Sequence, residues 1–128
     1  MASSHSALLL GALAFAAACG RGKGASADGG WASLEARPCP SGSILTYQDF
    51  GQPFFRDWCT GCHSADLAAQ DRQGAPVGID FDSLAGIRTH LDDIWSHAAD
   101  QNALMPPVGS PSSEDRAWLG DWLACGTP

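Results

Sequence analysis

Basic residues are scarce in this chain of 128 residues, which has 7 Lys plus Arg against 14 Asp plus Glu. A nucleic-acid-binding domain needs a basic surface to neutralise phosphates, so the formal net charge of −7 argues against that class of function. A membrane-spanning helix needs about 20 consecutive apolar residues, and the chain has no apolar run of that length. No segment alternates apolar and polar residues over five positions, which argues against a β-sheet. The length therefore fits one small helical domain.

Cysteine is present in an odd number, 5, which leaves one cysteine without a partner in an exported chain. Export is indicated by residues 7–18, ALLLGALAFAAA, whose length suits a signal-peptide core. With Cys19 directly after AAA, the segment resembles a bacterial lipoprotein signal. Residues 1–18 are therefore expected to be removed and Cys19 to carry a lipid; the alternative is an ordinary signal peptide. The same resemblance implies that Gly20, rather than Asp, after Cys19 favours a position at the periplasmic face of the outer membrane.

Glycine dominates the next segment, with five among residues 20–30 and no large apolar side chain. Such a stretch cannot bury enough surface to fold, so residues 19–37 are expected to form a flexible tether. The folded domain is expected over residues 38–128. Trp31 and Leu34 either begin the folded part or lie on its surface.

Apolar periodicity predicts three helices, over residues 49–58, 81–98 and 113–124. In the first, Phe50, Phe54 and Trp58 recur at a spacing of four and so share one face. The apolar positions of the second are Leu84, Ile87, Leu91, Ile94, Trp95 and Ala98. Asp80 or Asp82 can cap its start.

The third predicted helix has clear signals at both ends. Ser112 followed three positions later by Asp115 resembles a capping box, and Gly126 is a natural stop. Two long loops rich in Gly and Pro, over residues 64–78 and 105–111, remain between the helices. Loops of that length in a small domain usually carry function.

The sequence Cys59-Thr60-Gly61-Cys62-His63 is C-x-x-C-H, the attachment motif of c-type haem. Thiols three positions apart can reach the two vinyl groups of the porphyrin, and His63 is then placed to bind the iron. One alternative is a thioredoxin-like dithiol, because Trp58 precedes Cys59, but that fold needs a β-strand before the motif. Another is a zinc site of Cys59, Cys62 and His63, which would need a further ligand.

Met105 is the candidate sixth ligand of the iron, because it lies in a Pro-rich loop and Pro106 and Pro107 follow it. A thioether ligand raises the reduction potential relative to a second His. The alternative for Met105 is gap filling in the core. His90 and His97 are competing ligands, but both flank the apolar face of their helix and are expected at the surface.

Taken together, Cys59-x-x-Cys62-His63, Met105-Pro106-Pro107 and the final helix resemble a bacterial monohaem class I cytochrome c over residues 44–128. The resemblance implies an all-α fold of three to four helices around one covalent haem. Its first and last helices would cross beside the haem, which places Phe50, Phe54 or Phe55 against Trp118, Leu119 or Trp122. Trp122 would pack in the haem pocket. The Pro76 carbonyl would accept a hydrogen bond from His63.

The remaining cysteines are Cys39, before the first predicted helix, and Cys125, at the end of the last. Free thiols are disfavoured in exported proteins, and the implied fold brings these positions close, so a disulfide is expected. A loop of this length corresponds to about 4 kcal/mol on the chain-entropy model. Two unpaired thiols are the alternative.

The sequence thus predicts an electron-transfer protein that carries one haem c, bound by His63 and Met105. It would be a carrier rather than an enzyme, or a domain or subunit that serves an oxidoreductase. The alternatives are a haem-based small-ligand binder with an open sixth position and a dithiol oxidoreductase that uses Cys59 and Cys62. The acidic balance favours a redox partner with a basic docking patch.

Overall fold

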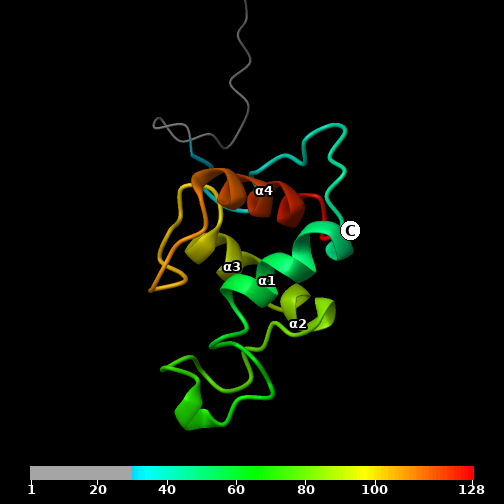
Figure 1. The fold of residues 1–128 in the computed structure, drawn as a ribbon. Coiled ribbons are helices and arrows are strands. Elements are labelled where there is room, and N and C mark those ends of the chain that lie inside the picture. The colour runs from blue at the N-terminus through cyan, green and yellow to red at the C-terminus, as the bar shows by residue number, and fades with distance from the viewer. Residues whose placement is uncertain (1–29) are drawn as a thin grey trace, which may run out of the picture.

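The computed structural model describes residues 30–128, so the predicted signal peptide, Cys19 and the first part of the predicted tether lie outside the described residues. Over residues 30–128 the chain is all-α and has no strand (Figure 1). Its helical elements are a π-helical turn at Tyr47–Gly51, α1 at Gln52–Trp58, a 3-10 turn at Ala69–Asp71, α2 at Leu84–Arg88, α3 at Leu91–Ala98 and α4 at Ser113–Ala124. None of these helices is long and apolar enough to cross a membrane.

The first predicted helix begins two residues early, in the π-helical turn, and is capped by Thr46. The Thr46 hydroxyl accepts a hydrogen bond from the Asp49 backbone N–H at 3.1 Å. The face shared by Phe50, Phe54 and Trp58 is buried only in part. Phe54 and Phe55 are buried, whereas Trp58, at the last turn of α1, is 36% exposed.

The second predicted helix is two helices, because the chain leaves helical geometry between Arg88 and Leu91. Thr89 donates its hydroxyl to the Gly86 carbonyl at 2.7 Å, and His90 has a non-helical backbone. A side-chain bond of this kind satisfies a carbonyl that the helix ladder would otherwise use. α3 therefore starts anew and turns its apolar residues toward α4.

The cap of α2 is Ser83, whose hydroxyl accepts from the Gly86 backbone N–H at 3.1 Å. The prediction of Asp80 or Asp82 as the cap was wrong because the preceding loop uses both carboxylates. Asp82 accepts from the Ala65 backbone N–H at 2.8 Å. Asp80 forms an ion pair with Arg72 at 2.7 Å.

The last helix, α4, has the predicted bounds and caps. Ser112 and Asp115 form the reciprocal capping box, with the Asp115 N–H at 3.0 Å from the Ser112 hydroxyl. After Cys125, Gly126 adopts a left-handed backbone with φ of 81°, which ends the helix.

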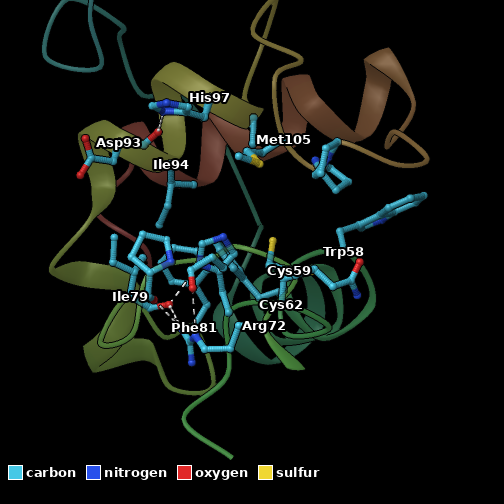
Figure 2. A pocket seen from close by; sticks show the side chains of 18 of the residues that line it. Trp58, Cys59, Cys62, Arg72, Ile79, Phe81, Asp93, Ile94, His97 and Met105 are labelled. Atoms are coloured by element: carbon cyan, nitrogen blue, oxygen red, sulfur yellow. Dashed lines mark hydrogen bonds between the residues drawn. The ribbon is translucent and has the colours of Figure 1, made fainter. Parts of the chain in front are cut away.

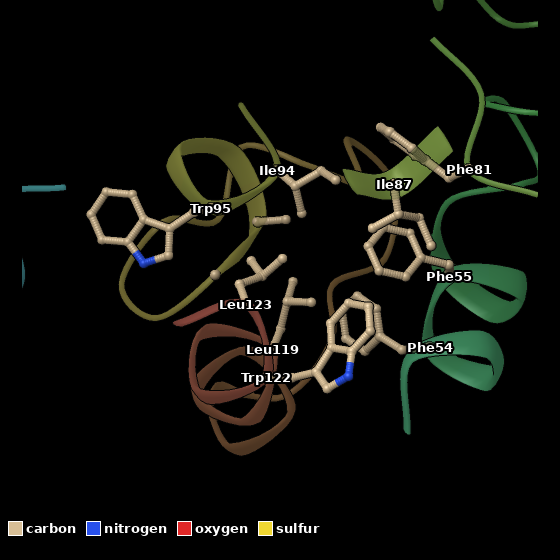
Figure 3. Packing of buried hydrophobic residues seen from close by; sticks show 11 residues of the cluster. Phe54, Phe55, Phe81, Ile87, Ile94, Trp95, Leu119, Trp122 and Leu123 are labelled. Carbon is tan, nitrogen blue, oxygen red and sulfur yellow. The ribbon is translucent and has the colours of Figure 1, made fainter. Parts of the chain in front are cut away.

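α1, α3 and α4 converge on one apolar core (Figure 3). Its buried members are Phe54, Phe55, Phe81, Ile87, Ile94, Trp95, Ala98, Ala99, Leu119, Trp122 and Leu123. The first and last helices meet through aromatic rings, with the Trp122 ring centroid 6.3 Å from that of Phe50 and 6.1 Å from that of Phe55. The backbone comes so close at Gly51 that a Cβ there would lie 2.7 Å from Trp122 Cζ2.

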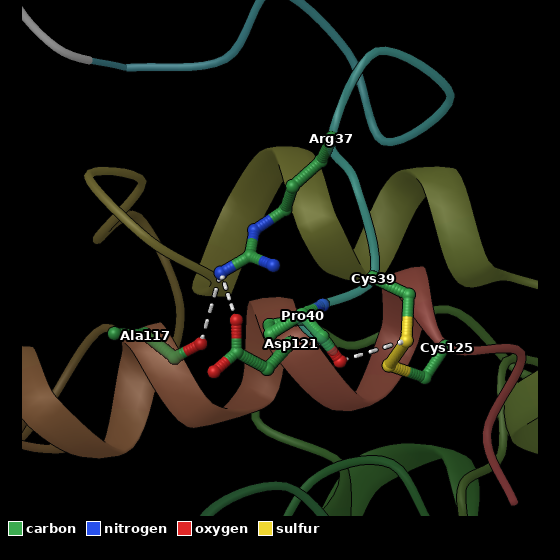
Figure 4. The surroundings of a disulfide bond; sticks show 6 residues. All are labelled: Arg37, Cys39, Pro40, Ala117, Asp121 and Cys125. Carbon is green, nitrogen blue, oxygen red and sulfur yellow. Dashed lines mark hydrogen bonds and ion pairs between the residues drawn. A yellow bond between two sulfur atoms is a disulfide. The ribbon is translucent and has the colours of Figure 1, made fainter. Parts of the chain in front are cut away.

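The folded part begins earlier than residue 38. Trp31 and Leu34 pack against the core, and the Arg37 side chain is only 7% exposed. Arg37 binds Asp100 at 2.7 Å. It also binds Asp121 at 2.8 Å (Figure 4). Arg37 also donates to the Ala117 carbonyl at 3.2 Å, so the last residue of the predicted tether contacts partners far along the chain.

Two residues beyond Arg37, Cys39 forms a disulfide with Cys125 at the end of α4 (Figure 4). This is the pairing that the sequence analysis expected, and it spans a sequence separation of 86. We call the segment of residues 30–39 the N-terminal strap. The ion pairs of Arg37 and the disulfide fix the strap along α4.

Substitution of Gly51 tests the close approach of the first and last helices. We expect Gly51→Ala to lower the free energy of unfolding by about 1–2 kcal/mol, because the fully buried Trp122 ring cannot move aside. Gly61→Ala is the matched control, since a Cβ there meets nothing within 4 Å. Equal effects of the two variants in urea unfolding would contradict this packing.

Substitution of Arg37 tests the attachment of the strap. Arg37→Met leaves Asp100 and Asp121 without their cation, so we expect a loss of about 3 kcal/mol in urea unfolding under non-reducing conditions. Arg56→Met is the control, because the Arg56–Asp57 pair is exposed and its removal should leave the midpoint unchanged. An unchanged midpoint for Arg37→Met would show that the strap contributes little.

A candidate cofactor-binding cavity

One cavity of about 490 Å³ lies between the end of α1, the loop over residues 64–80, α3 and the loop that carries Met105 (Figure 2). Its volume falls in the range of about 300–1,000 Å³ that is typical of small-molecule and cofactor sites. Apolar side chains form most of its wall: Phe54, Phe55, Trp58, Ile79, Phe81, Ile94, Ala98 and Leu119. The cavity can therefore enclose a large apolar group.

Cys59, Cys62 and His63 all line this cavity and come from one turn directly after α1. The turn is closed by its own backbone, because the N–H groups of Cys62 and His63 donate to the Cys59 carbonyl at 3.1 and 2.9 Å. Both thiols are free of disulfides. The C-x-x-C-H spacing thus brings two thiols and an imidazole to one wall.

The His63 ring is held in a fixed orientation. Its Nδ1 lies 3.0 Å from the Ile79 carbonyl oxygen, and the Phe81 ring stacks on it with centroids 4.9 Å apart. Because a carbonyl only accepts, Nδ1 carries the proton and donates, which leaves the Nε2 lone pair for a metal. The His63 carbonyl also accepts from the Phe81 N–H at 2.9 Å.

The prediction that the Pro76 carbonyl accepts from His63 was wrong. Pro76 does line the cavity, but its carbonyl accepts from Arg72 at 2.7 Å. The chain turns again at Gly78, which has a φ of 89°, and this second turn brings Ile79 rather than Pro76 under the imidazole.

Met105 lies across the cavity from the two thiols (Figure 2). Its loop is fixed to α3, because the Leu104 and Met105 backbone N–H groups both donate to the His97 carbonyl at 2.9 Å. The side chain is 42% exposed, so it is not a core residue. Pro106 and Pro107 line the cavity beside it.

The two competing histidines differ in position. His97 is exposed and lines the cavity, with its Nδ1 2.7 Å from the Asp93 carbonyl oxygen. His90 does not line the cavity; its ring meets Phe81 edge-on at 6.0 Å. Of the two alternatives to Met105, only His97 is therefore close to the site.

Trp122 does not line the cavity, contrary to the prediction. It lies fully buried behind Phe55, and its Nε1 donates to the Pro128 carbonyl at 3.3 Å. Leu119, one turn earlier on α4, takes the position at the cavity wall. Leu119 and Trp122 both belong to the apolar face of α4, so periodicity alone does not predict which of them lines the cavity.

Arg72 is the functional candidate that sequence reasoning missed. It lines the cavity and is 1% exposed, although it stands in a polar loop, AAQDRQGAP, that reads as solvent-exposed. Its partners are backbone carbonyls of the same loop and the Asp80 carboxylate. Such contacts leave no recognisable motif in the sequence, so the burial of Arg72 could not be predicted from it.

Burial is the main influence on the pKa of the Cys59 thiol. Burial, and then the neighbouring Cys62, raise the pKa of the Cys59 thiol to about 12. For Asp82, burial acts to raise the pKa. Hydrogen bonds from Ser64 and Ala65 and the charge of Arg72 outweigh it, so the pKa of Asp82 is lowered.

Among residues 30–128, no group of three or more His, Cys, Asp or Glu side chains is arranged to hold a metal ion by itself. The zinc alternative therefore has no complete ligand set in this part of the chain. Comparison of the chain with protein-family models, with curated proteins and with solved structures gave no match.

The raised pKa of Cys59 predicts a poorly reactive thiol. In the chain without haem, at pH 8, we expect iodoacetamide to modify Cys59 roughly a thousandfold more slowly than free cysteine, whose pKa is about 8.5. Peptide mapping over a time course measures the rate, and the same chain in guanidinium is the control. Modification of the folded chain as fast as free cysteine would contradict the burial of this thiol.

Proposed function

We propose that this chain is an electron carrier with one covalent c-type haem, attached at Cys59 and Cys62 and bound axially by His63 and Met105. The observation that carries the proposal is the convergence on one cavity of two unpaired thiols, an oriented imidazole and, on the opposite wall, a thioether. The fold would then be a cytochrome c fold around the haem.

The residues of the cavity fit such a group. The two thiols are available for thioether bonds, and the His63 Nε2 has its lone pair free because Nδ1 donates to Ile79. The apolar walls exclude water from an apolar macrocycle. When bound, haem supplies reversible one-electron chemistry at its iron.

The remaining features suit a carrier better than an enzyme. Met105 is a soft ligand that favours a high potential, and its loop is stiffened by two prolines and tied to α3. Trp58 and Met105, 36% and 42% exposed, stand between the cavity and solvent. A cofactor edge near the surface is sufficient for electron exchange with a partner protein.

The dithiol alternative is disfavoured by the position of Cys59. The residue caps the C-terminal end of α1, where the helix dipole opposes a thiolate. Its pKa of about 12 is the reverse of the lowered value that a nucleophilic cysteine needs.

A ligand-binding haem domain is the second candidate, and the exposure of Met105 favours it. A side chain that is 42% exposed in a loop without helical structure can leave the sixth position open. In that case small ligands such as carbon monoxide would bind the reduced protein rapidly.

The location and the partner of the proposed carrier are inferred from the N-terminal residues and from the net charge. Residues 1–18 would direct export, and a lipid on Cys19 would hold the domain at the periplasmic side of a bacterial membrane, the outer membrane being favoured. The formal charge of −7 favours a redox partner with a basic docking patch.

Optical spectroscopy tests the axial ligands. We expect the exported protein, matured by a c-type haem system, to show a sharp reduced α-band and a weak far-red band when oxidised. Met105→Ala should lose the far-red band and gain carbon monoxide binding, whereas Leu104→Ala, a change in the exposed neighbour, should leave both unchanged.

Each other result has a clear meaning. A far-red band that persists in Met105→Ala would exclude Met105 as the ligand. Rapid carbon monoxide binding by the unchanged protein would favour the open-site alternative. Absence of haem after maturation would contradict the proposed function.

A further inference from the structure

We propose that Arg72 is a positioning residue that sets how strongly His63 donates to the bound iron, acting through the Ile79 carbonyl. This inference rests on the proposed function, because it concerns His63 as the iron ligand. Arg72 itself is separated from His63 by the carbonyl group that both residues contact.

The shared carbonyl is the central observation. The Ile79 oxygen lies 3.0 Å from His63 Nδ1 and 2.9 Å from Arg72 Nη2, so it accepts from both donors. A carbonyl oxygen has two lone pairs and can serve two donors at once. Figure 2 shows Arg72 and Ile79 at the same end of the cavity, with dashed bonds converging there.

Arg72 is held in place by the rest of the loop. It is 1% exposed, and its guanidinium also donates to the carbonyls of Ser64, Ala75 and Pro76. The Asp80 Oδ1 lies 2.7 Å from Arg72 Nη2, and this carboxylate partly neutralises the charge of the guanidinium. The Asp80 Oδ1 has no hydrogen bond of its own, because the two Nη2 hydrogens point to Pro76 and Ile79. The other three carbonyls and Asp80 therefore hold the buried guanidinium in contact with the Ile79 carbonyl.

The direction of the effect follows from competition for that oxygen. A hydrogen bond from a cation is strong and draws electron density from the carbonyl, which makes the oxygen a poorer acceptor for His63. With a weaker Nδ1–H···O bond, the imidazole has less imidazolate character and is a weaker donor to a metal. Arg72 therefore favours the reduced iron and raises the reduction potential.

The experiment compares the reduction potential of the haem-loaded protein with that of two variants. We expect Arg72→Met to lower the potential and Arg72→Lys, which keeps the charge, to lower it less. Arg88→Met is the matched control, because Arg88 also binds a backbone carbonyl, that of Thr127 at 2.8 Å, but does not line the cavity. The control should lower stability and leave the potential unchanged.

A second readout does not depend on the iron. In NMR spectra of the reduced protein, and equally of the chain without haem, the His63 Nδ1 proton should move downfield in Arg72→Met as its bond to Ile79 strengthens. If Arg72→Met fails to fold, Asp80→Asn carries the test. Loss of the counter-charge strengthens the pull of Arg72, so the same proton should move upfield and the potential should rise.

The two proposals fail in different ways. An unchanged potential and an unchanged His63 proton in Arg72→Met, with the His–Met spectrum intact, would overturn the role of Arg72 and leave the proposed function standing. A wild-type chain that takes up no haem would overturn the proposed function. The His63 proton would still decide whether Arg72 competes for the Ile79 carbonyl.

Discussion

The contact between His63 Nδ1 and the Ile79 carbonyl connects the sequence motif to the cavity. At 3.0 Å it closes the loop over residues 64–80 onto the turn that carries both thiols, so the loop becomes a cavity wall. The same contact fixes the tautomer of His63 and leaves Nε2 available. Arg72 stabilises the loop from within by binding its carbonyls. Without this closure, the thiols and the imidazole would stand on an open turn at the end of α1.

The rest of the fold positions the other residues that line the cavity. α1 and α4 approach closely at Gly51, and their aromatic rings interlock, which places Phe54, Phe55 and Leu119 around the cavity. The strap reinforces α4 through the Arg37 ion pairs and the Cys39–Cys125 disulfide. The His97 carbonyl holds the Met105 loop to α3, so both walls of the cavity are attached to the same core.

Features that depend on contacts between residues close in the sequence were predicted correctly. The Ser112–Asp115 capping box gave the start of α4 and Gly126 its end, and C-x-x-C-H gave one wall of the cavity. Features that depend on distant partners were missed or misplaced: the break at Thr89, the use of Ile79 instead of Pro76, and the buried guanidiniums of Arg37 and Arg72. An arginine in a polar loop looks exposed until the fold supplies carbonyls or carboxylates around it.

The central claim is that Cys59 and Cys62 hold a haem covalently in a cavity that Met105 faces. The most direct measurement is the intact mass of the exported, matured protein after denaturation in acid, which releases any haem that is not covalently attached. The account predicts a mass increase of one haem, no alkylatable thiol at Cys59 or Cys62, and an intact Cys39–Cys125 bridge. A chain of unmodified mass, with both thiols free to react, would contradict it.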